Sequence, residues 1–439
     1  MTDNTAALSR VGGVSRRYIL FMLMLVYVVN YIDRTVLNIL LPAIKAEFHL
    51  SDAALGLLSG TSFAIFYATL GIPLAWLADR VNRRNIIALS MALFSTMTVF
   101  SGLAPNFVAL VFARLGTGIG EAGTSPPVNS IISDLYEPKE RASALSFYAM
   151  GLNIGLLISS FGGGWMDQHF GWRAAFLAAG VPGLLLTLGI LLTVPEPRRG
   201  QVERLTDSGL TPPLTETLSY LFAMPSFRLM ASGCALSAFG GYAGAAFIPT
   251  FLVRNHGLTP SEVGLVLAGL FGVVGGLGTY FSGVFADALG KRDVRWNMNV
   301  IVLAIVVAVP FFPFYFLSSN FTLVLLAGIM PTAIGAAYIA PAYAMVQSLV
   351  PLRMRAQAAA FLLFILNIIG FGLGPLLVGA LSDALTPTFH ADALRWALLS
   401  TVTTWIVSAA CYWFAGRYLP GDLAKAHAPR DPVLAEVAT

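Results

Sequence analysis

The chain has 439 residues, of which 57% are hydrophobic and only 11% are charged, and its mean hydropathy is +0.76. Soluble proteins carry about 25% charged residues, so this composition excludes a soluble globular fold and indicates a membrane protein with many spans. The net charge of +4 is explained by basic loops on one membrane face, and we infer no nucleic-acid partner from it.

Hydropathy and helix-breaking residues predict twelve transmembrane helices in two groups of six, an N-terminal bundle at 17–193 and a C-terminal bundle at 226–418. The first apolar run is too long for the core of a signal peptide, so we expect it to be retained as the first helix. The polar segment 194–225 is predicted to be a cytoplasmic linker with a short surface helix near Leu214 to Phe222, and 1–16 and 419–439 are predicted to be cytoplasmic tails. The predicted spans are 17–41, 52–79, 84–104, 107–134, 141–166, 172–193, 226–253, 260–288, 296–317, 320–349, 355–383 and 393–418.

Basic residues at or beyond the ends of the predicted spans lie almost all on the side of the two termini. Those on the opposite side are Lys45, Arg173, Arg254 and Arg395. Since Lys and Arg are enriched in cytoplasmic loops, we expect both termini in the cytoplasm and the chain in a cell inner membrane.

Four ionisable residues lie inside the first and fourth predicted spans, where a charge is costly and indicates function: Asp33, Arg34, Arg114 and Glu121. At a helical rise of 1.5 Å, Asp33 lies about 8 Å and Arg114 about 10 Å below the outer face, and Glu121 lies two turns deeper, at about 21 Å. An Asp beside an Arg stays ionised, and protonating it would release the Arg, so we predict Asp33 as the main proton site. Glu121 is predicted to be a relay or a partner for a cationic group. The alternative is a static cluster that only holds the two helices together.

The predicted C-terminal bundle is rich in aromatic residues instead of charges. This asymmetry favours an amphiphilic substrate whose charged head contacts Arg34, Arg114 and Asn30 while its apolar tail occupies the C-terminal bundle. The alternative is that the aromatic residues simply pack helices or face lipid. The residues predicted for the tail cavity are Tyr242, Phe247, Tyr338, Asn367 and Phe371.

A small residue four positions before an Asp recurs at the ends of spans 2, 5, 8 and 11. Asp79 and Asp287 fall on the cytoplasmic side, whereas Asp167 and Asp383 fall outside. This spacing is typical of inverted three-helix repeats nested in two halves, and it predicts alternating access. We expect the four Asp to act as gates, together with the basic residues Arg83, Arg84, Lys291 and Arg292.

Glycine-rich runs mark two further positions. One runs from Gly116 to Gly123 before Pro126, and the other runs from Gly370 to Pro375. Small residues let helices approach closely and Pro loosens the helical hydrogen bonds, so we predict bending or close packing at both runs.

The stretch from Gly283 to Arg292 matches the Gly-x-x-x-Asp-x-x-Gly-Lys-Arg loop signature and resembles the major facilitator superfamily over essentially the whole chain. The first-half copy departs from it, with Ala75 and Asn82 where glycines are usual. Asn30-Tyr-Ile-Asp33-Arg34, together with the run from Arg114 to Glu121, is similar to the Spinster branch, whose animal members export sphingosine-1-phosphate or lysophospholipids. The resemblance implies an all-α major facilitator fold.

Three functions are compatible with these residues. The first is a proton-coupled transporter that exports a lysolipid or sphingoid phosphate or moves it between leaflets, and the second is a carrier for small organic anions or cationic drugs. The third is a lipid sensor that does not transport. No arrangement of nucleophile and base indicates an enzyme, and Cys234 and Cys411 lack the spacing of a metal site, so we expect no cofactor and no metal. The expected partners are a lipid-like substrate, protons and membrane lipids, with the chain as a monomer.

Overall fold

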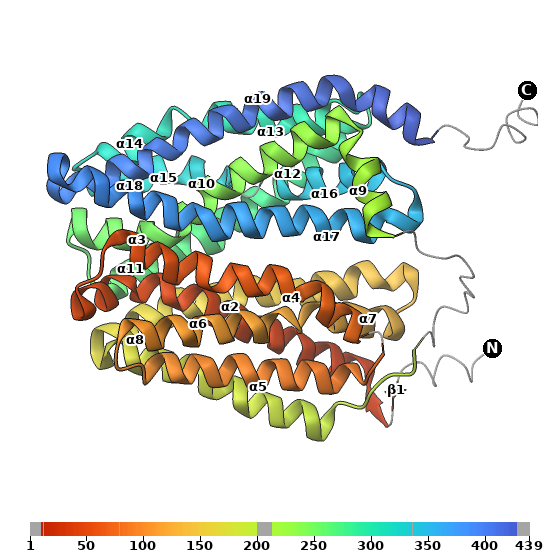
Figure 1. Cartoon of the computed structure of the whole chain (residues 1–439), viewed down its shortest axis with the longest axis horizontal. Helices are drawn as coiled ribbons and strands as arrows, with labels where there is room; N and C mark the ends of the chain where they lie inside the picture. The colour runs from red at the N-terminus through yellow and green to blue at the C-terminus, as the bar shows by residue number, and fades with distance from the viewer. Residues whose placement is uncertain (1–9, 12, 79, 200–212, 336, 428–439) are drawn as a thin grey trace, which may run out of the picture. The chain divides into compact units, whose positions relative to one another are not determined.

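The computed structural model describes residues 10–427 apart from 12, 79, 200–212 and 336. The only strands in this part are β1 (Arg10–Val11) and β2 (Val14–Ser15), which pair antiparallel, and almost everything else is helical (Figure 1). The helices up to the linker are α2 (Arg16–Phe48), α3 (Asp52–Gly56), the π-helix η1 (Leu57–Thr61), α4 (Ser62–Ala78), α5 (Arg83–Gly102), α6 (Phe107–Ala122), α7 (Ser125–Leu135), α8 (Pro138–Thr193) and α9 (Leu214–Phe222). Those that follow are α10 (Pro225–His256), α11 (Pro260–Leu267), the π-helix η2 (Ala268–Val274), α12 (Gly275–Gly290), α13 (Trp296–Ala308), α14 (Phe311–Leu317), α15 (Phe321–Ile334), α16 (Ile339–Ser348), the 3-10 helix η3 (Leu352–Met354), α17 (Arg355–Ile365), the π-helix η4 (Leu366–Leu373), α18 (Gly374–Phe389), the 3-10 helix η5 (His390–Asp392) and α19 (Ala393–His427).

All twelve predicted spans fall on these helices, and the predicted surface helix is α9. Eight helical segments of the described chain are long and apolar enough to cross a membrane, or nine if the bent pair α13 and α14 counts as one span. Two of the segments join neighbouring predicted spans. α8 continues across a break at Gly171, whose φ of +82° suits glycine, and η5 separates α18 from α19.

The two glycine-rich runs are irregular in the structure. α6 ends at Ala122, and α7 starts at Ser125 with Pro at its first turn. The second run starts in η4, where the chain forms π-helix instead of α-helix, and ends in the first residues of α18. Both runs therefore coincide with an interruption of regular α-helix, and bending at them stays a prediction.

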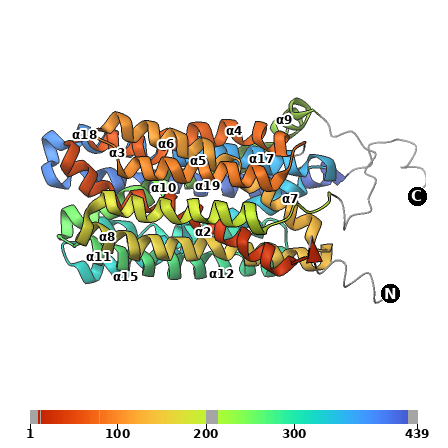
Figure 2. The ribbon, with the colours of Figure 1, turned by 90° about the horizontal axis from the view of Figure 1, so that it is seen from below.

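The helices form two compact units. Unit 1 contains Met1–Asp207, Ala243–Val273 and Phe371–Ala397, and unit 2 contains Ser208–Tyr242, Val274–Gly370 and Leu398–Thr439. In unit 1, α8 packs along α2 and α5, α4 packs on α6, and α18 packs on α3 (Figures 1 and 2). In unit 2, α14 packs on α15 and α16 packs on α17. Unit 1 includes Ala243–Val273 and Phe371–Ala397 from the second half of the chain, so the units do not coincide with the two predicted six-helix bundles. The bundles stay a prediction.

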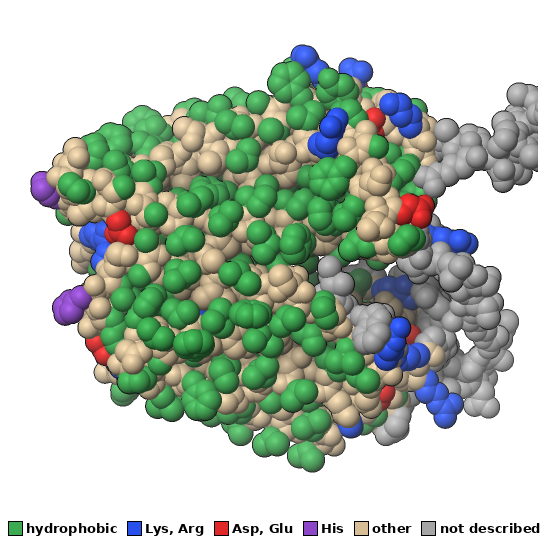
Figure 3. Space-filling model, in the orientation of Figure 1, with side chains coloured by type: hydrophobic (Ala, Val, Ile, Leu, Met, Phe, Trp, Pro, Cys, Tyr) green, Lys and Arg blue, Asp and Glu red, His purple; other side chains and the backbone are tan. Residues whose placement is uncertain are grey.

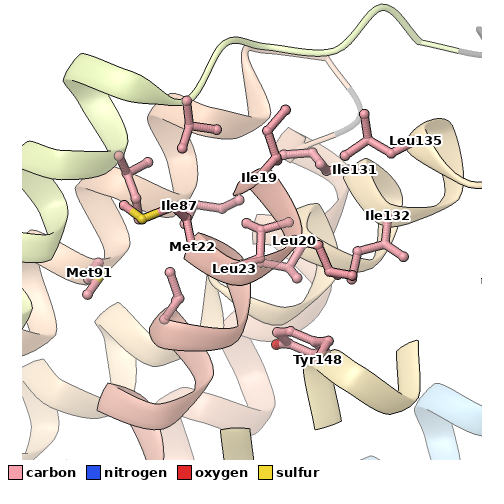
Figure 4. Close-up of a cluster of buried hydrophobic side chains, with 14 of the residues drawn as sticks. Ile19, Leu20, Met22, Leu23, Ile87, Met91, Ile131, Ile132, Leu135 and Tyr148 are labelled. Carbon is pink, nitrogen blue, oxygen red and sulfur yellow. The ribbon is translucent and has the colours of Figure 1, made fainter. Parts of the chain in front are cut away.

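Unit 1 has an apolar cluster where α2, α5, α7 and α8 meet (Figure 4). Ile19, Leu23, Met91 and Ile132 are at most 1% exposed there. Other apolar side chains point outward, and on the face seen in Figure 3 hydrophobic groups cover the length of the helices while Lys and Arg gather near helix ends. An outer surface of this kind suits a lipid environment, where apolar side chains need no burial inside the protein.

Candidate functional site

The structure brings Asp33 of α2 and Arg114 of α6 into contact inside unit 1. Arg114 Nη1 donates to Asp33 Oδ2 at 3.0 Å, and the two side chains are 0% and 1% exposed. The hydroxyl of Thr98 in α5 donates to Asp33 Oδ1. The predicted shared layer of Asp33 and Arg114 is therefore confirmed, and both oxygens of the Asp33 carboxylate accept hydrogen bonds.

A second ion pair joins the same two helices. Arg34 Nη2 donates to Glu121 Oε2 at 2.6 Å, and the Glu121 side chain is completely buried. Among the described residues, its other oxygen, Oε1, is buried without a hydrogen-bond partner, as are Nε and Nη2 of Arg114. The two carboxylates therefore differ: both oxygens of Asp33 accept a hydrogen bond, whereas only one oxygen of Glu121 does so among the described residues.

Helix geometry explains why the two pairs form. Neighbouring residues on α2 point about 100° apart, whereas residues seven apart on α6 lie on one face about 10 Å from each other, so each α2 charge meets a different α6 charge. Glycines let α6 approach its neighbours. A Cβ added at Gly118 would lie 2.6 Å from the carbonyl oxygen of Phe63, and one at Gly120 would lie 2.6 Å from the backbone nitrogen of Phe94. The close packing predicted for this run is thus confirmed.

Aromatic rings surround the Arg34 guanidinium. Its Cζ lies 4.8 Å from the ring centres of Phe63 and Tyr67, 5.5 Å from that of Tyr31 and 5.9 Å from that of Phe371, all within unit 1, and we call these four rings the aromatic cage. The Arg34 side chain is 17% exposed, whereas Asp33, Arg114 and Glu121 are not more than 1% exposed. Cation–π attraction at these distances holds a guanidinium in place even without a carboxylate. Arg34 is therefore the accessible member of the cluster.

Asn30, one helical turn before Arg34, extends the cluster toward the break in the fourth predicted span. Its Nδ2 donates to Thr124 Oγ1 at 2.9 Å, while its Oδ1 is buried without a partner. A buried polar atom that lacks a partner costs about 1–3 kcal/mol, so several of them in one cluster indicate a place where a proton, water or ligand binds.

A second cluster, which we call the Asp52 network, lies at the start of α3. The Asp52 carboxylate pairs with Lys45 and with Arg254, whose Nη1 and Nη2 donate to Oδ2 and Oδ1 at 3.0 and 2.8 Å, and accepts a bond from the Ser382 hydroxyl at 2.6 Å. The predicted gate residue Asp383 accepts bonds from the backbone nitrogens of Asp52 and Ala53 at 2.8 and 2.7 Å. The network thus joins α2, α3, α10 and α18 at ends that the sequence predicts to be external.

Close backbone contacts accompany this network. A Cβ added at Gly56 would collide with the carbonyl oxygen of Pro375, and one at Gly379 would collide with that of Asp52. On the other side of unit 1, a Cβ at Gly264 would collide with the carbonyl oxygen of Ser160. Only glycine permits such approaches, so α3 with α18 and α8 with α11 form two tight helix pairs.

The family model of the Major Facilitator Superfamily matches residues 23–315 and 230–436. The chain belongs to this superfamily. It is 34% identical over 404 residues to an MFS-type efflux pump of Mycolicibacterium smegmatis, which covers 92% of this chain and 93% of the relative. It is 27% identical over 448 residues to protein spinster homolog 1 of Xenopus laevis, covering 94% of this chain and 84% of the relative.

A solved structure agrees with these relatives. The crystal structure of a bacterial homologue of the human lysosomal transporter Spinster, inward-facing and unoccupied, matches with a TM-score of 0.86 and 33% identity over 93% of this chain and 98% of that one. The chain is thus a major facilitator transporter of Spinster type with the all-α fold of the superfamily, and its relatives are transporters, not enzymes.

The signature loops of the superfamily are only partly described here. Asp79 lies outside the described residues, and so does the side chain of Asp287. Lys291 and Arg292 are exposed. Arg83 is buried and pairs with Asp134 and with Glu196 Oε1 at 2.8 Å, and the backbone nitrogen of Arg84 donates to Glu196 Oε2 at 2.8 Å. The described part of the first loop is therefore tied to α7 and to the start of the linker.

The residues predicted for the tail cavity of this transporter do not share one unit. Phe247 and Phe371 belong to unit 1, where Phe371 is part of the aromatic cage and Phe247 has no exposed surface. Tyr242, Tyr338 and Asn367 belong to unit 2, where the amide of Asn367 donates to the Leu363 carbonyl oxygen at 2.8 Å.

Several residues of the two clusters escaped the sequence analysis. Thr98, Phe63 and Tyr67 carry no charge, and only the four-residue spacing of the two aromatic residues hinted that they share a helix face. Asp52 is the first residue of the predicted span 52–79, and the sequence analysis gave it no role. The sequence offered one signal, the small number of basic residues predicted to be external, which would need acidic partners. In the structure all four are ion-paired: Lys45 and Arg254 with Asp52, Arg173 with Glu47, and Arg395 with Asp392.

Proposed function

We propose that this Spinster-type transporter couples protons to the movement of an amphiphile with an anionic head group, a lysolipid or a sphingoid phosphate. The observation that carries the proposal is the Arg34–Glu121 ion pair, in which a buried carboxylate with one unpaired oxygen holds a partly exposed guanidinium. Charges in the middle of membrane spans are costly, so their retention favours a functional role over a purely structural one.

In this proposal Glu121 is the principal proton site. Oε1 of Glu121 has no partner, so a proton can bond there without displacing a donor. Each oxygen of Asp33, in contrast, already accepts a hydrogen bond, from Arg114 or from Thr98. The sequence predicts Asp33 as the main proton site. In this proposal Asp33 is the second proton site, and its charge is coupled to that of Glu121 through the ion pairs between the same two helices.

Protonation of Glu121 would cancel the negative charge that holds Arg34. The guanidinium would then stay within the aromatic cage and offer its N–H groups to a new acceptor. Arg binds phosphate oxygens through two parallel hydrogen bonds, which makes a phosphate head group a fitting partner. Arg114 and Asn30 are more completely buried than Arg34, and we propose that they support the head-group site electrostatically.

This coupling has a direction. A proton on Glu121 favours an anion on Arg34, so the proton and the anionic amphiphile would be carried together. A cationic drug would instead compete with the proton for Glu121 and would move against it. The efflux-pump relative from Mycolicibacterium keeps this second function open, and the coupling direction separates the two.

The rest of the transport cycle is proposed from the superfamily. We propose that Tyr242, Phe247, Tyr338, Asn367 and Phe371 contribute to the path of the apolar tail, and that the Asp52 network with Asp167 and Asp383 acts as the external gate. Arg83, Arg84, Lys291, Arg292, Asp79 and Asp287 are proposed as the cytoplasmic gate. We propose a monomer in a bacterial inner membrane, with both termini in the cytoplasm.

Substrate class is tested by thermal unfolding of the detergent-solubilised protein with a panel of ligands. Lysophospholipids and sphingoid phosphates at micromolar concentration are expected to raise the unfolding temperature, whereas soluble organic anions are not. Arg34→Gln should abolish the protection, because the head group loses its proposed partner. Arg173→Gln removes an exposed external Arg and serves as the matched control.

Three results would contradict the proposal. Protection by small organic anions alone would move the substrate to the second class of carrier. Lysolipid protection that persists unchanged in Arg34→Gln would show that the head group binds elsewhere. Protection by lysolipids without any transport in vesicles would instead favour a lipid sensor.

A further inference from the structure

A cavity of about 540 Å³ lies in unit 1 at the first turns of α2. It is lined by Arg16, Arg17 and Leu20 of α2, by Tyr136 after α7, and by α8 residues including Glu140, Ser143 and Phe147. Asp33 lies about 25 Å farther along α2 at 1.5 Å per residue, so the cavity is separate from the proposed transport site.

One wall of the cavity is fixed by several interactions. Arg16 Nη1 and Nη2 donate to Glu140 Oε2 and Oε1 at 2.9 and 3.2 Å, a two-point contact. The Arg16 guanidinium also lies 4.8 Å from the centre of the Tyr136 ring, and the Tyr136 hydroxyl donates to the Arg16 carbonyl oxygen at 3.3 Å. The charge of Arg16 is therefore already neutralised, and the wall is held in place.

Arg17 contributes the positive charge of the lining that Glu140 does not offset. It is exposed, and among the described residues its side chain makes no hydrogen bond and no ion pair. With Arg16 offset by Glu140, the lining carries one net positive charge. A cation beside a cavity, with no carboxylate partner of its own, favours an anionic ligand.

The other walls are apolar. Leu20 belongs to the buried cluster drawn in Figure 4, and Phe147 is 37% exposed at the cavity. Next to Arg17 on α2, Tyr18 and Phe21 are 38% and 44% exposed. The apolar membrane span starts at Arg16, so the cavity lies where lipid head groups meet acyl chains.

We propose that this cavity binds the head group of an anionic membrane phospholipid. The lipid phosphate contacts Arg17, and the adjoining acyl chain lies on Phe147 and the exposed aromatic side chains of α2. Basic pockets between helices on the cytoplasmic side suit anionic lipids, whereas a zwitterionic lipid brings its own cation close to Arg17. Bound there, the lipid bridges the start of α2 and the start of α8.

The test is a titration of the detergent-solubilised full-length protein with phosphatidylglycerol, followed by thermal unfolding. Phosphatidylcholine and inorganic phosphate are titrated in parallel arms. Phosphatidylglycerol is expected to protect the wild type at the lowest concentration. Arg17→Gln should raise the concentration needed about fivefold, which corresponds to about 1 kcal/mol for one surface cation near a lipid.

A second variant tests the cavity independently, in case Arg17→Gln disturbs folding. Ser143→Asp places a negative charge at the cavity and should weaken phosphatidylglycerol protection to a similar extent, whereas Ser143→Asn should not. Arg198→Gln, at an exposed basic residue of the same unit that does not line the cavity, should match the wild type.

Three outcomes would overturn the proposal. The first is equal protection of the wild type, Arg17→Gln and Ser143→Asp by phosphatidylglycerol. The second is equal protection of the wild type by phosphatidylcholine. The third is protection by inorganic phosphate alone, which would assign the cavity to a soluble anion. The variants used here do not change Arg34 or its partners, so this test is independent of the proposed transport function.

Discussion

Replacing Arg114 by Gln is expected to lower the free energy of unfolding by about 3–5 kcal/mol, the cost of leaving a buried charge without its partner. In this variant the Asp33 carboxylate keeps only the hydroxyl of Thr98, in a place where both members of the pair are not more than 1% exposed. Water cannot solvate the carboxylate there, so the loss exceeds that of a surface ion pair, which is at most about 1 kcal/mol. Reversible unfolding in mixed micelles with increasing denaturing detergent measures the difference.

The double variant Asp33→Asn with Arg114→Gln should recover most of this loss, because two neutral amides leave no unpaired charge. Thr98→Val is the graded control, since it removes one neutral donor from the same carboxylate and should cost about 1 kcal/mol. A loss of less than 1 kcal/mol in Arg114→Gln would show that the pair is solvated in the folded protein. A double variant as unstable as Arg114→Gln would show that shape, not charge, determines the stability at this site.

Gly56→Ala is expected to separate α3 from α18 at the ends predicted to be external. The added methyl group would collide with the backbone of Pro375, and backbone atoms cannot move aside as a flexible side chain can. The two helices must therefore move apart, and the Asp52 network beside them should loosen. In protein lacking Cys234 and Cys411, we expect a cysteine placed at Ser59, which is 2% exposed, to react with a membrane-impermeant maleimide at least tenfold faster than without the glycine substitution.

Gly71→Ala is the matched control on the same predicted span, because a Cβ there would meet no atom within 4 Å. It should leave the labelling rate at Ser59→Cys unchanged. Equal labelling of Gly56→Ala and Gly71→Ala would contradict the role of the close α3–α18 contact in closing this end of unit 1. Faster labelling in both variants would show that any side chain on this span disturbs its packing.

The sequence was sufficient for the positions of the apolar helical spans along the chain and for the central charges. Each span is a long apolar run, and hydropathy depends on composition more than on contacts. Asp33, Arg34, Arg114 and Glu121 could be found because a charge inside such a run is conspicuous, and the helical rise alone placed Asp33 and Arg114 in one layer.

The partners of those charges could not be found in the same way. Depth arithmetic placed Glu121 about 13 Å deeper than Asp33, and it gives neither the rotation of a helix nor the reach of an Arg side chain. It therefore could not show that Arg34 contacts Glu121 while Asp33 contacts Thr98. Phe63 and Tyr67 of the aromatic cage looked like any other aromatic residues in a chain with 30 Phe. The Asp52 network joins residues of four different helices, and no local pattern connects Lys45 with Arg254.

The arrangement of the central charges also changed the order of the proposed proton sites. Burial alone treated Asp33 and Glu121 alike, and the sequence favoured Asp33 because it stands beside an Arg. The hydrogen bonds distinguish them, since both oxygens of Asp33 have partners and Oε1 of Glu121 has none. A free acceptor position is a property of the packed helices and not of the residue type.

The most direct test of the account is uptake of a labelled lysolipid into proteoliposomes under an imposed pH step, with Asp33→Asn and Glu121→Gln measured beside the wild type. We expect an acidic exterior to drive uptake by the wild type, and we expect Glu121→Gln to lose the dependence on the pH step because Arg34 is then permanently released. Asp33→Asn is expected to lower both the rate and the coupling. Uptake that follows the pH step equally in the wild type and in both variants would contradict the central claim that these two carboxylates couple protons to transport.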